Sequence, residues 1–189
     1  MDAPIDNVLR WLLKASSLVG KEYMQLPVAD ADPRYRERVY CYELYHQMRC
    51  QWPSAFQYAL CGEIDKRKHA YVRGEYLDNI KPDFLVHAPG QMNPDSNLLA
   101  VEVKPANTTS TKIVEDVQKL TALRRNLINS YDQPANYQHA IFWLYGGLPK
   151  NWDDLKQQLK QNKFDDVDVR LIRCFVHERV GRSAVECAW

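Results

Sequence analysis

Two apolar segments joined by a short polar turn place the strongest constraint on the fold of this chain. Residues 80–88 and 98–105 are rich in aliphatic and aromatic side chains, whereas 89–97 is dominated by proline, glycine, asparagine and aspartate. This pattern is typical of two strands connected by a turn. If the turn closes between Pro89 and Ser96, antiparallel partners have residue numbers that add up to 185. The sequence therefore predicts an antiparallel hairpin with a defined register.

This register brings two acidic residues together. Alternate residues of a strand share a face, so Asp83 is expected directly across from Glu102, at a Cβ separation of about 4.5–5.5 Å. Two ionised carboxylates at that distance repel each other unless a positive charge lies between them, and a divalent cation bound by oxygen atoms supplies one. Lys104 is expected about 7 Å further along the same face, where its ammonium can contact a water molecule and a phosphate. The pattern indicates metal-dependent phosphodiester hydrolysis.

Each of these short motifs is common when it occurs alone. A single Pro-Asp or Glu-x-Lys usually supplies surface charge on a half-solvated strand. Here the acids lie on consecutive strands in matching register, and a helical pattern follows directly, so the combination favours a catalytic role.

The remaining segments alternate between helical and strand periodicity. Asp32 and Pro33 form a typical helix start, which predicts a loop before them and a helix after them. The predicted helices span 4–20, 34–51, 111–131 and 152–160, and the predicted strands span 54–65, 80–88, 98–105, 140–145 and 167–176. This order predicts an α/β fold, with a mixed central β-sheet flanked by helices. The helix over 111–131 is expected to pack on the side of the sheet that carries Val101 and Val103.

Length and composition limit the alternatives. A chain of 189 residues fits a single domain, here with an N-terminal helical extension over 1–32. The net charge of +1 argues against a protein that coats nucleic acid through general basic charge. Five cysteines without a C-x-x-C pair argue against a zinc ribbon and favour reduced thiols in a cytoplasmic protein. No apolar segment approaches the roughly 20 residues that cross a bilayer, so no membrane association is expected.

Pro82-Asp83 followed by Glu102-Val103-Lys104 resembles the PD-(D/E)xK nuclease superfamily, which includes restriction-type endonucleases. The resemblance covers about residues 34–145 and implies a restriction-endonuclease-like core of order αβββαβ. It implies Mg²⁺ or Mn²⁺ as cofactor, held by Asp83 and Glu102, with Lys104 as a further catalytic residue. Members often add an acid from the preceding helix, and Glu43 matches that position, which implies a catalytic and metal-binding role for it.

The sequence around Gly62 and Glu63 resembles that of small standalone bacterial nuclease-like proteins. RecB-type exonucleases carry Gln-x-x-x-Tyr after the motif, whereas Gln118 is followed four places later by Ala122. Membership of that exonuclease branch is therefore not expected.

Several further residues are weaker candidates. Glu63, His87 and Gln118 are predicted to support the site, although a solvated strand end or an incidental position explains each equally simply. Glu43 itself has a plain alternative as a surface acid paired with Arg36 or Arg49. The densest basic groups are predicted to contact backbone phosphates, although loop charges are usually just solvated: Lys66, Arg67, Lys68, Arg73, Arg124 and Arg125.

The sequence therefore predicts a metal-dependent nuclease that hydrolyses nucleic acid, with DNA favoured over RNA. There is little room for a separate recognition domain, so a homodimer or a partner protein is expected to supply specificity. The alternative is a catalytically silent nuclease-fold module that binds nucleic acid or a partner protein in a defence or repair assembly.

Overall fold

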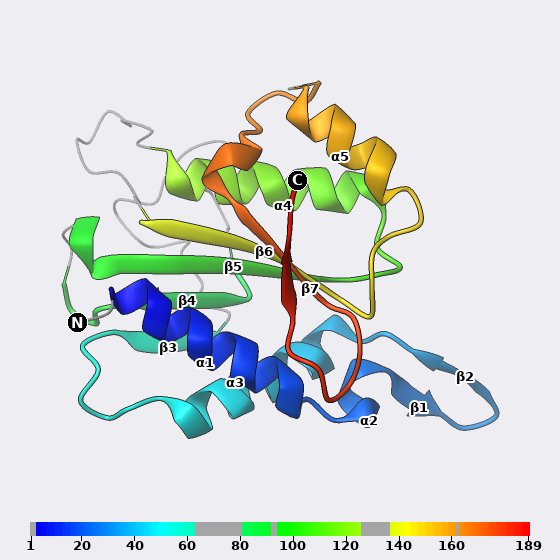
Figure 1. Ribbon diagram of the computed structural model, residues 1–189, viewed down its shortest axis with the longest axis horizontal. Coiled ribbons are helices and arrows are strands. Elements are labelled where there is room, and N and C mark those ends of the chain that lie inside the picture. The colour runs from blue at the N-terminus through cyan, green and yellow to red at the C-terminus, as the bar shows by residue number, and fades with distance from the viewer. Residues whose placement is uncertain (1–2, 63–80, 92–93, 126–136, 162) are drawn as a thin grey trace.

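A computed structural model of the chain describes residues 3–62, 81–91, 94–125, 137–161 and 163–189. Its centre is a six-stranded mixed sheet of order β3-β4-β5-β6-β7-β8 (Figure 1). The strands are β3 (Ala59–Gly62), β4 (Phe84–His87), β5 (Asn97–Pro105), β6 (His139–Tyr145), β7 (Arg173–His177) and β8 (Val185–Cys187). The helices are α1 (Pro4–Leu18), α2 (Lys21–Met24), α3 (Glu37–Gln51), α4 (Ser110–Arg124) and α5 (Trp152–Lys160), with short 3-10 turns η1 (Pro94–Ser96) and η2 (Val169–Leu171). The predicted mixed sheet flanked by helices is confirmed.

The hairpin between β4 and β5 has the register that the sequence predicts. Phe84 pairs with Val101, Leu85 with Ala100 and Val86 with Leu99, in antiparallel orientation. The register shifts only at the turn, where His87 pairs with Asn97. β3 adds a further antiparallel strand, and β6 and β7 continue the sheet in parallel beyond β5.

The predicted start of the second helix is wrong. Asp32 and Pro33 lie in a short strand, β2 (Ala31–Arg34), which pairs with β1 (Leu26–Val28) where a loop was expected. Asp30 at the turn adopts a positive φ of 57°, a conformation that aspartate tolerates better than most residues. The helix α3 begins at Glu37 instead. Pairing in this hairpin outweighs the local preference of Asp-Pro for a helix start.

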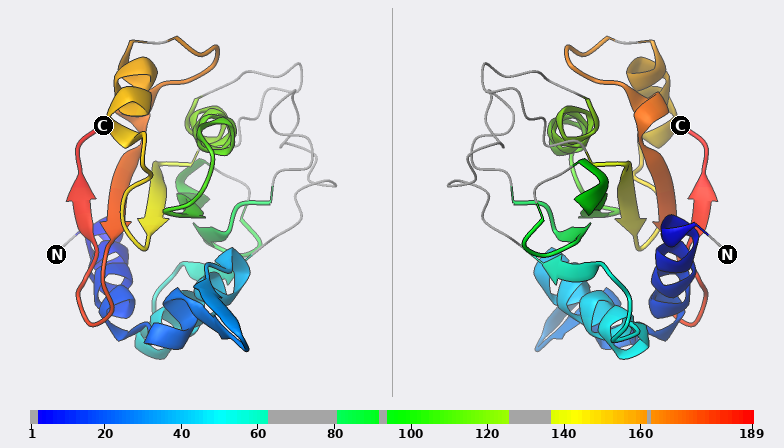
Figure 2. Two further views of the ribbon diagram at one scale, coloured as in Figure 1. Left: turned by 90° about the vertical axis from the view of Figure 1, so that its right-hand side faces the viewer. Right: turned by 90° about the vertical axis from the view of Figure 1, so that its left-hand side faces the viewer.

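Helices cover both faces of the sheet (Figure 2). On one face, side chains of α1 and α3 pack on Val101 and Val103; on the other, α4 and α5 pack on Leu85 and Ala100. The prediction that the helix after β5 packs on the Val101 and Val103 side is therefore wrong. β5 is buried on both faces, and Glu102 and Lys104 lie on the face that α4 covers, so the alternation of its side chains does not predict which face α4 packs on. The crossover from β5 through α4 to the parallel strand β6 selects it, because such crossovers have a fixed hand.

The carboxyl-terminal segment differs from its prediction as well. The expected strand over 167–176 is divided into η2 and β7, and β8 pairs antiparallel with β7 at the edge of the sheet. Trp189 then packs against Phe142 and Trp152, with ring centroids 5.8 and 5.6 Å away. Among the described residues, no helix has the length and apolar character that a bilayer crossing requires.

A buried hydrogen-bond chain ties α3 to the sheet. The indole of Trp143 donates to the hydroxyl of Tyr40 at 2.9 Å, and that hydroxyl lies 2.8 Å from Nδ1 of His177. Nε2 of His177 lies 3.1 Å from the carbonyl of Arg179, which can only accept, so Nε2 donates and Nδ1 accepts from Tyr40. Burial lowers the pKa of His177 to about 4. The neutral imidazole thus helps to hold α3 and the strand end near Tyr145 in place.

Candidate active site

Asp83 is oriented by the strand next to it. Its Oδ2 accepts a hydrogen bond from the backbone N–H of Val103 at 2.7 Å. Asp83 directly precedes the last ladder pair, Phe84 with Val101, and its carboxyl lies close enough to Glu102 to raise the pKa of that residue. Burial raises the pKa of Asp83 to about 6, although nearby Lys104 and the Val103 N–H lower it.

Glu102 lies in the middle of β5 and is only 4% exposed. Its Oε1 is buried and has no hydrogen-bond partner within the described part of the chain. Burial raises the pKa of Glu102, and the carboxyls of Asp116 and Asp83 raise it further. A buried carboxyl oxygen without a partner is costly, and such an atom is a candidate ligand for a cation.

Lys104 lies on the same face of β5 and is held between two carboxylates. Its Nζ is 3.1 Å from Oε2 of Glu37 and 3.1 Å from Oδ2 of Asp116. Burial by itself lowers the pKa of Lys104, but the surrounding carboxyls, with Asp116 first, raise it above the ordinary value. The ammonium is therefore permanently charged in the folded protein, at a position fixed by two helices.

Asp116 is a site residue that sequence reasoning missed. It is 3% exposed, and its Oδ1 also lies 2.7 Å from Nζ of Lys119. Asp116 falls on the same face of α4 as the buried residues Ile113 and Leu120. An acid on the apolar face of a helix was the available signal.

Glu37, rather than Glu43, is the acid that α3 brings to Lys104. Glu37 lies in the first turn of α3, where the helix dipole favours a negative charge. Glu43 is six residues further on, about 240° around the helix, and its Oε1 accepts a hydrogen bond from Gln47 at 2.7 Å. The catalytic and metal-binding role predicted for Glu43 remains a prediction, and Glu37 is the acid of α3 that contacts Lys104.

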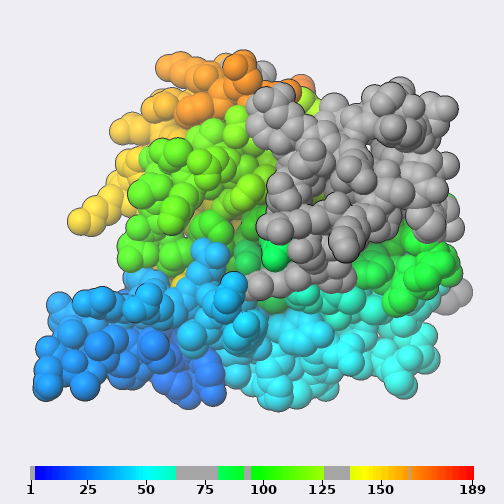
Figure 3. Space-filling view, turned by 180° about the vertical axis from the view of Figure 1, so that it is seen from behind, coloured from blue at the N-terminus to red at the C-terminus, as the bar shows by residue number. Residues whose placement is uncertain are grey.

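A hollow of about 290 Å³ leads from the surface to Asp83. Its walls come from α3, the end of β3 and the start of β4: Cys41, Tyr42, Tyr45, Gly62, Asp83 and Phe84. Tyr42 is 61% exposed. In the space-filling view from behind, the cyan residues of α3 and β3 lie below the green residues of later segments (Figure 3).

The charges of the cluster suit a divalent cation. Four carboxyl groups, those of Glu37, Asp83, Glu102 and Asp116, face two ammonium groups, those of Lys104 and Lys119. With every group ionised the cluster would carry two negative charges, and the raised pKa values of Asp83 and Glu102 reflect the cost of that state without a further cation. No group of three or more His, Cys, Asp or Glu side chains in the described residues is arranged to hold a metal ion. Mg²⁺ commonly uses only one or two carboxylates and takes its other ligands from water and substrate phosphate. Asp83 and Glu102, with the unpartnered Oε1, fit such a site.

Two of the weaker candidates lie away from this cluster. Gln118 donates to the carbonyl of Asp165 at 2.9 Å and lines a groove between α4 and α5. His87 lies at the far end of β4, four residues from Asp83 and thus about 13 Å along the strand. Neither is brought to Lys104.

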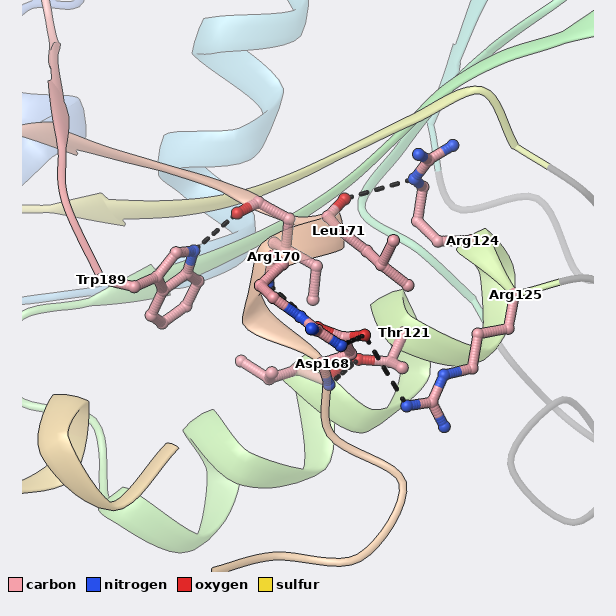
Figure 4. Close-up of polar contacts among 9 residues, drawn as sticks. Thr121, Arg124, Arg125, Asp168, Arg170, Leu171 and Trp189 are labelled. Atoms are coloured by element: carbon pink, nitrogen blue, oxygen red, sulfur yellow. Dashed lines mark hydrogen bonds and ion pairs between the residues drawn. The ribbon is translucent and has the colours of Figure 1, made fainter. Parts of the chain in front are cut away.

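The two arginines at the end of α4 make contacts within the fold (Figure 4). Arg124 donates to the carbonyls of Leu171 and Tyr137 at 3.2 and 2.6 Å. Arg125 lies 4.0 Å from Asp168, which binds Arg170 more closely at 2.8 Å. Glu63, Lys66, Arg67, Lys68 and Arg73 lie outside the described residues.

Comparisons of this chain with family models, with curated proteins and with solved structures each found no match.

Proposed function

We propose that this chain is a metal-dependent nuclease that hydrolyses phosphodiester bonds, in DNA rather than RNA, with Mg²⁺ or Mn²⁺ bound by Asp83 and Glu102. One observation carries the proposal: the half-buried Asp83 and the buried Glu102 and Lys104 gather in one cluster, next to the paired residues of the β4–β5 hairpin. The order α3, β3, β4, β5, α4, β6 is compatible with the αβββαβ core of PD-(D/E)xK nucleases, and this likeness supports the same assignment.

Each residue then has a role that its surroundings explain. Asp83 is held by the Val103 N–H, so its carboxyl keeps one orientation as substrate arrives. Glu102 offers a buried oxygen without a partner. A divalent cation held by the carboxyls of Asp83 and Glu102 would supply Lewis-acid chemistry that activates water and offsets charge on the phosphate.

Lys104 contributes fixed positive charge beside the two acids. Asp116 and Glu37 hold its ammonium from α4 and α3, so little reorganisation is needed when negative charge develops on a phosphate. Asp116 and Glu37 are in this view positioning residues. The hollow against Asp83 provides a route for the nucleic acid strand, and a second copy or a partner protein would supply sequence preference.

One observation favours the alternative, a silent module that binds nucleic acid or a partner protein. Lys104 is already paired with two carboxylates, and a lysine neutralised in this way could serve packing alone. The two functions differ in whether any phosphodiester bond is broken.

Incubation of the full chain with supercoiled plasmid, linear duplex, single-stranded DNA and RNA tests the proposal. Each substrate is combined with Mg²⁺, Mn²⁺ or EDTA, and Asp83→Asn with Glu102→Gln serves as the matched inactive variant. We expect metal-dependent cleavage that EDTA and the double variant abolish. If both proteins bind nucleic acid equally and neither cleaves any substrate, the chain is a silent binding module and not a nuclease.

A further inference from the structure

Two cysteines lie face to face at the edge of the sheet farthest from Asp83. Cys174 of β7 and Cys187 of β8 are direct antiparallel partners, and their sulfur atoms are 2.9 Å apart. Both are free thiols. Direct partners in an antiparallel pair have Cα atoms about 4.5–5.5 Å apart, within the range of about 4.4–6.8 Å that a disulfide spans. The backbone therefore already has the spacing of a cross-linked pair.

The two thiols differ in exposure and in acidity. Cys174 is buried, whereas Cys187 is partly exposed. The hydrogen bond between the two sulfurs lowers the pKa of Cys187, and the Lys156 ammonium lowers it as well. The same hydrogen bond, together with burial, raises the pKa of Cys174. The accessible sulfur is thus the better nucleophile, and the buried one is placed to complete an exchange.

We propose that Cys174 and Cys187 form a dithiol modification site that small organic disulfides convert into a cross-strand disulfide. The Cys187 thiolate attacks one sulfur of the reagent, breaks its S–S bond and releases one thiolate. Cys174 then loses its proton and attacks Sγ of Cys187, which releases the second half of the reagent as a thiol. The protein dithiol is oxidised by two electrons, and one reagent disulfide is reduced to two thiols.

The disulfide would join the short edge strand β8 covalently to β7. β8 has only three residues and leads directly to Trp189, whose indole donates to the carbonyl of Ile172 at 2.6 Å (Figure 4). Trp189 also covers Phe142 and Trp152 on the α4 and α5 side of the core. A disulfide at Cys187 would therefore keep Trp189 packed against Phe142 and Trp152. The inference does not depend on the proposed nuclease activity, since β4 and β5 lie across the sheet from β8.

A third cysteine, Cys50, provides a control for testing this site. Cys50 is exposed, and its sulfur lies 3.7 Å from the ring of His46, so it is the natural competitor for the same reagents. Cys50→Ser therefore removes adducts and intermolecular links without touching the pair. Cys187→Ser replaces the partly exposed thiol by a group of similar size.

The experiment equilibrates the reduced full chain with graded ratios of oxidised to reduced glutathione. Free thiols are trapped by alkylation, and the digested protein is read by mass spectrometry. In wild type and Cys50→Ser we expect a peptide pair that joins Cys174 to Cys187 with the loss of two hydrogen atoms. In Cys187→Ser that product is absent.

Thermal unfolding supplies the second measurement. Oxidised Cys50→Ser should unfold roughly 5–10 °C above its reduced form, and Cys187→Ser should show no such rise. A glutathione adduct that persists on Cys187, full alkylation of Cys187 at the most oxidising ratio, or a disulfide to another cysteine would each overturn the proposal.

Discussion

The ammonium of Lys104 lies 3.1 Å from the carboxylate of Asp116, across the interface between β5 and α4. Lys104 is 9% exposed and Asp116 is 3% exposed. A pair at this depth contributes little net stability when complete, but removal of one partner leaves an uncompensated buried charge. The contact therefore couples the proposed chemistry to the stability of the fold.

Lys104→Met should lose most cleavage and keep most metal affinity. The substitution removes fixed charge that stabilises the transition state by about 2.7–4 kcal/mol, so we expect a loss of roughly a hundred- to thousandfold in rate. Lys119→Met is the matched control, because it removes a charge from the same Asp116 but at a side chain that is 38% exposed. Metal titration and cleavage rates are measured together. A wild-type cleavage rate in Lys104→Met would show that this lysine has only a structural role.

Asp116→Asn should destabilise the protein because it leaves Lys104 and Lys119 without their shared counter-charge. We expect the free energy of unfolding to fall by about 3 kcal/mol at neutral pH. Glu115→Gln, at the exposed neighbouring position of α4, should change it by about 0.5 kcal/mol or less. Urea unfolding measures both, and equal losses in the two variants would contradict the structural role of Asp116.

Glu37→Gln and Glu43→Gln separate the two acids of α3. Glu37 contacts Lys104, whereas Glu43 is bonded to Gln47, so we expect the first variant to lower the cleavage rate at least about tenfold and the second to change it little. Single-turnover cleavage at saturating metal is the measurement. The reverse order of effects would restore Glu43 as the acid of this helix.

His177 should make stability depend on pH. Burial lowers its pKa to about 4 in the folded protein, against about 6.5 in the unfolded chain. Above the unfolded value the imidazole is neutral in both states and contributes no pH dependence. As pH falls from about 6.5 to about 4, the unfolded state takes up the proton first, so up to about 3 kcal/mol of stability is lost.

A comparison with His177→Asn isolates this contribution from the other titrating groups. Asparagine can keep a hydrogen bond with Tyr40 but does not titrate. The stability difference between wild type and the variant should be largest near pH 7 and should shrink as pH falls towards 4. A difference that stays constant over that range would show that His177 does not titrate as described.

The sequence alone determined the parts of this protein that depend on local period and turn chemistry. The alternation of β5 and the turn at Pro89 predicted that Asp83 and Glu102 meet, and the structure confirms that register through Phe84 and Val101. Side chains alternate with a period of two residues, so a slip of one residue would move every side chain to the opposite face of the sheet. The register of the strand pairing is therefore well defined. The α5 helix over Trp152–Lys160 was likewise predictable from its helical pattern and its acidic first turn.

The tertiary structure decided which distant residues join that pair. Glu37 lies in the first turn of α3, which begins after the β1 and β2 hairpin, and the packing of α3 on the sheet brings it to Lys104. Asp116 reached it because the crossover after β5 placed α4 on the Leu85 side of the sheet. The meeting of Cys174 and Cys187 depended on an edge strand of three residues that carries no clear periodicity. These contacts depend on which strands pair and on the handedness of the crossover connection from β5 to β6. Neither property can be predicted from the local pattern of side chains.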